Sequence, residues 1–146
     1  MDVTQMTGLE IMQAMASGKI PLPSICDTMP MTVMEIDEGF IKFEVHADHR
    51  HLNPLGGVHG GFIATVLDSV AGCSIHSTLP AGVSYGTVDL NVKMLRPVQQ
   101  QQALIAEGRF INATRRIAIA EGTLKDSSGK LYAHATTTCM LIHPGK

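Results

Sequence analysis

Tryptophan is absent from the 146-residue sequence, and aromatic residues make up only 4% of it. Aromatic platforms on which single-stranded bases stack are therefore scarce. A basic surplus is lacking too, because 11 Lys and Arg residues stand against 13 Asp and Glu, for a formal net charge of −2. Without the positive charge that holds a phosphate backbone, no nucleic acid is expected as a partner.

Cysteine is rare, and its spacing forms no known pattern. Cys26, Cys73 and Cys139 are far apart, odd in number and outside any CxxC or zinc-binding spacing. This usage predicts buried thiols in a reducing compartment, and hence a cytoplasmic location. The N-terminus has no basic region, and no continuous apolar stretch precedes Lys19. We therefore expect no signal peptide.

Long hydrophobic runs are also lacking. The most apolar stretch, residues 62–75, is shorter than the ~20 residues that a bilayer requires, and it carries Asp68. Four glycines between positions 56 and 61 precede it. The pattern predicts a buried core helix, and no membrane contact is expected.

The length suits a single domain, which we predict over residues 1–146 with a core at about 30–142. Apolar residues recur at helical spacing before Gly18, which predicts an N-terminal helix over about 5–17. Three prolines then predict an extended, irregular connector over 20–31.

Alternating residues predict a β-hairpin over 32–46, followed by a loop and a helix from about His59 to Thr78. In the next strand, Val88, Leu90, Val92 and Met94 are expected on one face. Strands at 104–111, 117–125 and 131–142 complete an expected antiparallel meander. The predicted class is α+β, with a curved antiparallel sheet wrapped round one long central helix. Such a sheet exposes its edges, so a homodimer or higher symmetric oligomer is expected.

Asp68 is the unusual residue of the apolar helix, since an unpaired buried carboxylate costs several kcal/mol. Two interpretations are open. In the first, the carboxylate emerges on a polar edge with Ser69 or is bonded to a neighbouring hydroxyl. In the second, it acts as a base or nucleophile in a dry cleft.

The glycine-rich segment 56–61 leads directly into this helix. It leaves backbone amides unpaired at the positive end of the helix dipole, a place that can bind a carbonyl oxygen or oxyanion. The glycines could equally allow a tight loop-to-helix turn. Gly60 and Asp68 are eight residues apart, about 12 Å along the axis, so one site would form most easily between two copies of the chain.

Other polar clusters carry weaker signals. His46, His49 and His51 lie near Asp48, but a solvated loop explains them better than a metal site because no fourth ligand follows at a recognisable spacing. A Cys–His nucleophile pair is disfavoured by the apolar surroundings of Cys73. No metal is expected.

Residues 53–61 (NPLGGVHGG), followed by Asp68 and by residues 87–91 (TVDLN), resemble the hotdog-fold acyl-CoA thioesterases. The most similar branch is that of phenylacetate degradation, within the 4-hydroxybenzoyl-CoA thioesterase-like superfamily. The resemblance covers about residues 30–142 and implies a thioester hydrolase that acts on an acyl- or aryl-coenzyme A. It also implies a homo-oligomer, in which dimers pair to a homotetramer.

Transferred to this sequence, the resemblance implies that the Gly60 amide polarises the thioester carbonyl. Asn53 would help to orient the carbonyl or a water molecule, and Thr87 would hold that water. Asp68 of the facing subunit would be the base or the nucleophile; both routes remain open, and neither needs a cofactor. Expected substrate-binding residues are His59, Gly61, Asn112, Arg115 and Arg116, the last three for phosphate contact.

Two alternatives use the same fold. A non-catalytic acyl-CoA-binding module would not need the carboxylate of Asp68. A dehydratase or hydratase would need a His paired with an acid, for which His59 is the candidate, although its position beside the glycines suits turn formation better.

Overall fold

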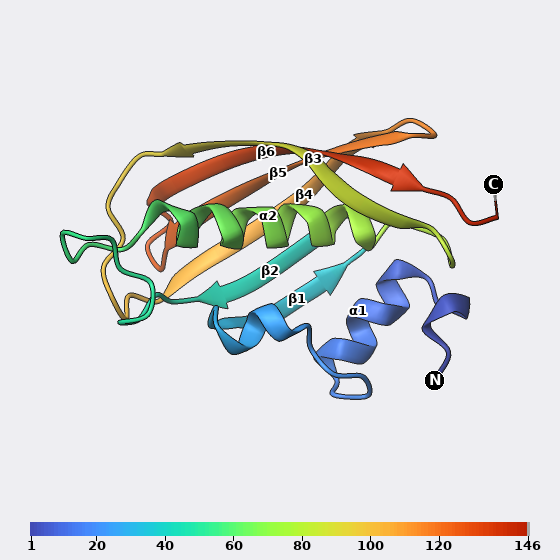
Figure 1. Ribbon diagram of the computed structural model, residues 1–146, viewed down its shortest axis with the longest axis horizontal. Coiled ribbons are helices and arrows are strands. Elements are labelled where there is room, and N and C mark those ends of the chain that lie inside the picture. Colours follow the sequence, from blue (N-terminus) through green and yellow to red (C-terminus); the bar gives the residue numbers. More distant parts are fainter. Residues whose placement is uncertain (146) are drawn as a thin grey trace.

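The computed structural model describes residues 1–145, which form an antiparallel sheet and a long helix (Figure 1). The elements in chain order are η1 (Val3–Gln5), α1 (Gly8–Ala16), η2 (Ser24–Asp27), β1 (Met31–Asp37), β2 (Phe40–Val45), α2 (Gly60–His76), β3 (Ser84–Met94), β4 (Leu104–Ala113), β5 (Ile117–Asp126) and β6 (Leu131–Ile142). Among the helices of residues 1–145, none has the length and hydrophobicity needed to cross a membrane.

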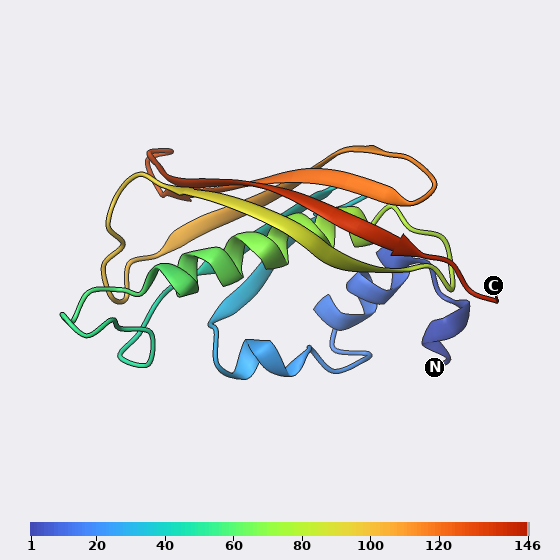
Figure 2. The same cartoon turned by 45° about the horizontal axis from the view of Figure 1, so that its top comes forward.

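The sheet has six strands in the order β1-β2-β4-β5-β6-β3, all antiparallel to their neighbours. Figures 1 and 2 show it curving round α2, which lies along its concave face. This arrangement confirms the expected α+β class and the wrapped central helix. The expected meander is only partly right, because β3 pairs with β6 and leaves β2 beside β4. Strands β1 and β3 are therefore the two edges.

Helix α2 begins where the side chain of His59 caps it, with Nδ1 accepting a hydrogen bond from the Gly61 amide at 2.7 Å. Its middle is fully enclosed, with Val66, Leu67 and Val70 at 0% exposure. An apolar helix of this kind must be covered on several sides, and the curved sheet does so.

Two glycines that sequence reasoning did not single out let α2 approach the sheet. Gly108 of β4 and Gly122 of β5 are cross-strand partners beneath the helix. A Cβ on Gly108 would lie 2.0 Å from the carbonyl oxygen of Val70, and one on Gly122 would lie 3.3 Å from Leu67. Because glycine has no side chain, α2 can pack this close to the sheet at both positions.

Helix α1 packs beside β1 and the C-terminal end of α2 (Figure 1). The expected helix is present as α1, with a capping box between Thr7 and Glu10, and Gly18 with φ +77° follows its end. A Cβ on Gly8 would lie 1.7 Å from the carbonyl oxygen of His76, so α1 begins in direct backbone contact with α2. The connector is not wholly irregular, because it contains η2.

Strand β3 departs from the predicted alternation at one position. A β-bulge between Thr87 and Asp89 leaves Val88 without a partner on β6, and its side chain is 59% exposed. The prediction that Val88 shares a face with Leu90 and Val92 is therefore wrong, because one inserted residue shifts the alternation.

Candidate active site

Asp68 lies halfway along α2 and meets Thr87 of the edge strand β3. The hydroxyl of Thr87 donates a hydrogen bond to Asp68 Oδ1 at 2.9 Å. Asp68 is half-buried and Thr87 is exposed in the single chain. The structure thus places two of the expected catalytic residues in contact within one chain. It also shows the hydroxyl partner foreseen for a carboxylate on a polar edge, and one carboxylate oxygen stays available for chemistry.

An apolar cavity of about 270 Å³ lies beside this pair. Asp68, Ser69 and Thr87 supply oxygen atoms at its wall. Most of the remaining wall is aliphatic or sulfur-containing and comes from α1, the connector, β1 and α2, with Met12, Met15, Ile25, Met31 and Val33 among its residues. A carboxylate with a hydroxyl partner at the edge of an apolar cavity can activate water beside a bound apolar group.

The glycine-rich loop lies at the beginning of α2. Asn53 Oδ1 accepts hydrogen bonds from the amides of Leu55 at 2.9 Å and Gly57 at 3.1 Å, so this oxygen organises the loop. His59 holds the Gly61 amide, which confirms its expected part in the turn. Within residues 1–145, the Gly60 amide bonds to no acceptor. Gly60 therefore offers a free N–H at the positive end of α2.

The loop is tied to the connector by a contact that sequence reasoning missed. His51 is buried, accepts a hydrogen bond from the Asp48 amide at Nδ1, and bonds the Thr28 carbonyl through Nε2 at 2.5 Å. Because Nδ1 accepts, Nε2 carries the proton that goes to Thr28. Arg50 joins Asp48 to the Asp27 carbonyl, and its hydrogen bonds hold the pKa of the Asp48 carboxyl well below its usual range. No group of three potential metal ligands occurs in residues 1–145.

The cysteines only partly match their prediction. Cys139 is buried, but Cys26 and Cys73 are partly exposed and line the cavity, because the space between the connector and α2 is left unfilled. Burial raises the pKa of the Cys73 thiol to about 12, with smaller contributions from Cys26 and Asp68. Burial likewise raises the pKa of Tyr85, another cavity residue. These groups are neutral at physiological pH.

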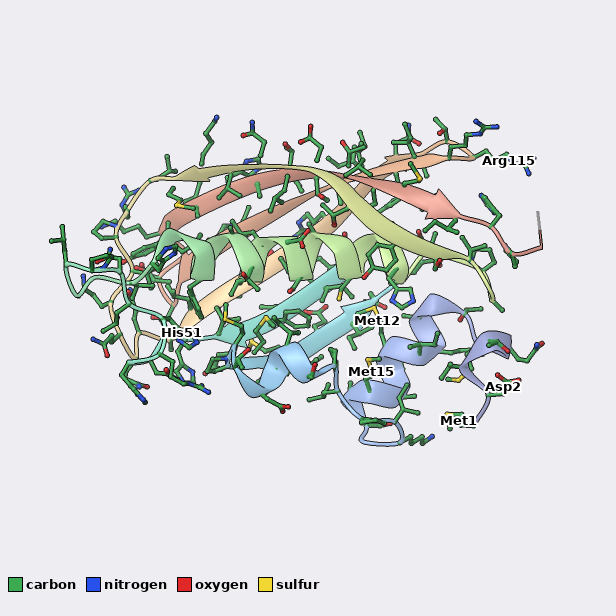
Figure 3. The ribbon with its side chains drawn as sticks, viewed as in Figure 1. Met1, Asp2, Met12, Met15, His51 and Arg115 are labelled. Carbon is green, nitrogen blue, oxygen red and sulfur yellow. The ribbon has the colours of Figure 1, made fainter. Side chains whose placement is uncertain are left out.

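The residues expected to contact phosphates lie elsewhere. Asn112, Arg115 and Arg116 are exposed at the β4–β5 turn, and none lines the cavity. Figure 3 shows Arg115 at the end of the molecule opposite His51 and the glycine-rich loop. Asn112 Oδ1 accepts a hydrogen bond from the adjacent Ala113 amide at 2.8 Å. Within one protomer these residues are separate from the Asp68–Thr87 pair.

Comparison with known proteins shows the family to which the chain belongs. The model of the thioesterase superfamily matches residues 55–133, more than half of the chain, including Gly60, Asp68 and Thr87. A Ralstonia eutropha structure described as a phenylacetic acid degradation-related protein has 33% identity and a TM-score of 0.80, and the match covers 88% of this chain and 97% of that one. The fold and these matches thus define a thioester hydrolase. The chain belongs to the thioesterase superfamily.

Other relatives match parts of the chain. Mouse acyl-coenzyme A thioesterase 13 is 27% identical over 65% of this chain and 68% of its own length. An esterase-like protein of Halobacterium salinarum is 38% identical over 45% of this chain, which spans only 44% of that protein. A Streptococcus mutans structure bound to acetyl CoA shares the fold, with a TM-score of 0.71, 22% identity and coverage of 80% of this chain and 91% of that one.

Proposed function

We propose that the protein hydrolyses the thioester bond of an acyl- or aryl-coenzyme A, releasing the free acid and coenzyme A. The observation that carries the proposal is the 2.9 Å contact between Asp68 and Thr87 at the wall of an apolar cavity. The name of the mouse relative and the acetyl CoA in the S. mutans structure support coenzyme A as the carrier.

The proposed reaction uses the Gly60 amide and the Asp68 carboxylate. The free Gly60 amide donates to the carbonyl oxygen, which gains negative charge on attack. Asp68 removes a proton from water, the new hydroxide bonds to the carbonyl carbon, and the C–S bond breaks as the thiolate leaves and is protonated. In the second route, the Asp68 carboxylate attacks the carbon and water hydrolyses the resulting anhydride. Asn53 helps to orient the carbonyl or water, and Thr87 helps to hold the water.

The active site is proposed to form between two copies of the chain. Gly60 and Asp68 stand eight residues apart on α2, about 12 Å, which is too far for one carbonyl group to contact both. Strand β3 carries Thr87 and is a free edge of the sheet, with Val88 and Met94 exposed on it. Antiparallel pairing of two β3 edges would bury these side chains and bring the Gly60 end of one α2 toward Asp68 of the other.

Further parts of the proposal concern the assembly. Exposed apolar side chains on neighbouring strands, Ile117, Ile119 and Met140, offer a surface through which two dimers can form a tetramer. Asn112, Arg115 and Arg116 are proposed to contact the phosphates of coenzyme A, with His59 and Gly61 near the thioester. We also propose that residues 1–146 form one domain, and that the free thiols reflect a cytoplasmic location.

The test is release of coenzyme A from short, medium, long and aryl acyl-CoAs, with a no-substrate blank for the protein's own thiols. We expect Asp68→Asn to lower kcat by about 10²–10⁴-fold, the usual contribution of a general base, while the fold and oligomeric state persist. Asp37→Asn is the matched control, because it makes the same chemical change at an exposed carboxylate outside the cavity.

The alternative function predicts a different outcome. If the wild type hydrolyses none of these esters, yet coenzyme A esters raise its melting temperature, the protein is a non-catalytic binding module. Full activity of Asp68→Asn would refute the assignment of the base or nucleophile.

A further inference from the structure

The cavity beside Asp68 has walls suited to a neutral apolar group. Its lining includes three methionines, Met12, Met15 and Met31, with only Phe43 and Tyr85 as aromatic residues and no Lys or Arg. Methionine side chains are unbranched and flexible, so a wall that contains them can adapt to the shape of a flexible alkyl chain. The acyl part of a thioester bound at Asp68 would enter this cavity, whereas the charged nucleotide would remain outside.

The size of the cavity limits the acyl group. An apolar cavity of about 150 Å³ binds benzene, with six carbon atoms. By the same proportion, the 270 Å³ cavity holds about ten carbon atoms. A phenylacetyl group has eight carbon atoms and would leave about a quarter of the cavity empty, and unfilled apolar space forfeits contacts. A medium-length alkyl chain fills it.

The outer wall comes from the N-terminal segment, defined here as residues 12–26. Met12 and Met15 of α1 and Ile25 and Cys26 of η2 line the cavity. Figure 3 shows Met12 and Met15 on the side of α1 that faces the sheet and α2. The thioesterase superfamily model matches residues 55–133, and the N-terminal segment lies outside this range. The part of the cavity wall formed by this segment therefore comes from residues that lie outside the family match.

We infer that the preferred acyl group is an aliphatic chain of about ten carbons, and that the N-terminal segment limits its length. The inference rests on the proposed function and specifies the substrate of the same site. Each methylene group that enters the cavity raises kcat/KM by about fourfold, and the gain ends when the chain reaches the wall formed by α1.

The experiment measures kcat/KM for butyryl-, hexanoyl-, octanoyl-, decanoyl-, dodecanoyl- and phenylacetyl-CoA. We expect a rise to decanoyl-CoA and then a plateau. Met15→Trp fills part of the cavity, and should lower kcat/KM for decanoyl-CoA by about 15-fold relative to butyryl-CoA, the loss of roughly two methylene contacts. Met15→Ala should move the plateau to longer chains. Gln13→Trp, exposed on the same helix and outside the cavity, should leave the profile unchanged.

Opposite shifts from Met15→Trp and Met15→Ala separate chain selection from general damage to the fold. A wild type that prefers phenylacetyl-CoA over decanoyl-CoA, or a plateau that neither Met15 variant moves, would overturn the inference while leaving the hydrolase proposal intact. If the wild type hydrolysed none of these esters, the proposed function itself would be refuted. Binding of the same series to the Asp68→Asn variant, measured by calorimetry, tests the chain-length preference without turnover.

Discussion

The hydrogen bond between Thr87 and Asp68 gives a quantitative test of the proposed site. Thr87→Val removes the hydroxyl but nearly keeps the side-chain shape, so the main loss is the 2.9 Å bond to Asp68 Oδ1. Hydrogen bonds to charged groups contribute about 1.5–3 kcal/mol, or roughly 10- to 150-fold in rate. Thr87 is exposed in the single chain, where water competes for the bond. We therefore expect a fall in kcat of about tenfold, near the lower limit.

The assay compares kcat and KM of Thr87→Val, Thr87→Ser, Asp68→Asn and the double variant Thr87→Val/Asp68→Asn, with the best acyl-CoA from the panel. Thr87→Ser keeps a donor and should retain most of the activity. If Thr87 acts by positioning Asp68, its effects depend on that carboxylate. We expect Thr87→Val to change kcat by less than about twofold in the Asp68→Asn background.

Two results would refute this reasoning. If the effects of Thr87→Val and Asp68→Asn multiplied in the double variant, the two residues would act independently, and their contact would not be the functional feature. If Thr87→Ser lost as much kcat as Thr87→Val, the methyl group rather than the hydroxyl would matter. A circular dichroism melt of each variant separates either result from loss of the fold.

Other predictions concern stability and reactivity. Gly108→Ala places a Cβ 2.0 Å from the Val70 carbonyl oxygen, so it should lower the free energy of unfolding by about 2–4 kcal/mol and Tm by roughly 10 °C. Gly86→Ala is the control, because the space around Gly86 is open, and it should change Tm by only about a degree or two. Equal shifts in Tm would contradict the packing argument. Since burial raises the pKa of Cys73 to about 12, iodoacetamide at pH 8 should label it only after unfolding in urea, and rapid labelling of the native protein would show otherwise. Burial lowers the pKa of His76 below its value in the unfolded chain, so the contribution of His76 to stability is complete above about pH 6.5 and falls as the pH decreases. The urea midpoints measured at pH 7.5 and pH 5.5 should therefore differ less in His76→Gln than in the wild type. An equal difference in both proteins would show that His76 does not cause the pH dependence.

Much of the architecture was predictable because it depends on local patterns. Alternating residues place β4, β5 and β6 within a few residues of their observed bounds, and the apolar run after the glycine-rich loop places α2. The side of β3 on which Val88 lies was not predictable, since the bulge at this position depends on pairing with β6. The strand order also depends on long-range pairing, which brings β2 beside β4 and β3 beside β6.

For the candidate site, the chemical groups could be read from the amino-acid order: one carboxylate in an apolar helix, a threonine on the strand that follows, and glycines at the start of the helix. Three features depend on the folded chain. Thr87 donates a hydrogen bond to Asp68, and residues 12–26 form the outer wall of the cavity. Within residues 1–145, the Gly60 amide has no acceptor, whereas the Gly61 amide donates to His59. The spacing of apolar residues along the sequence indicates which side of a helix or strand is buried. Contacts between residues 19 or more positions apart depend on how closely two packed surfaces approach, and here the glycines beneath α2 set that distance.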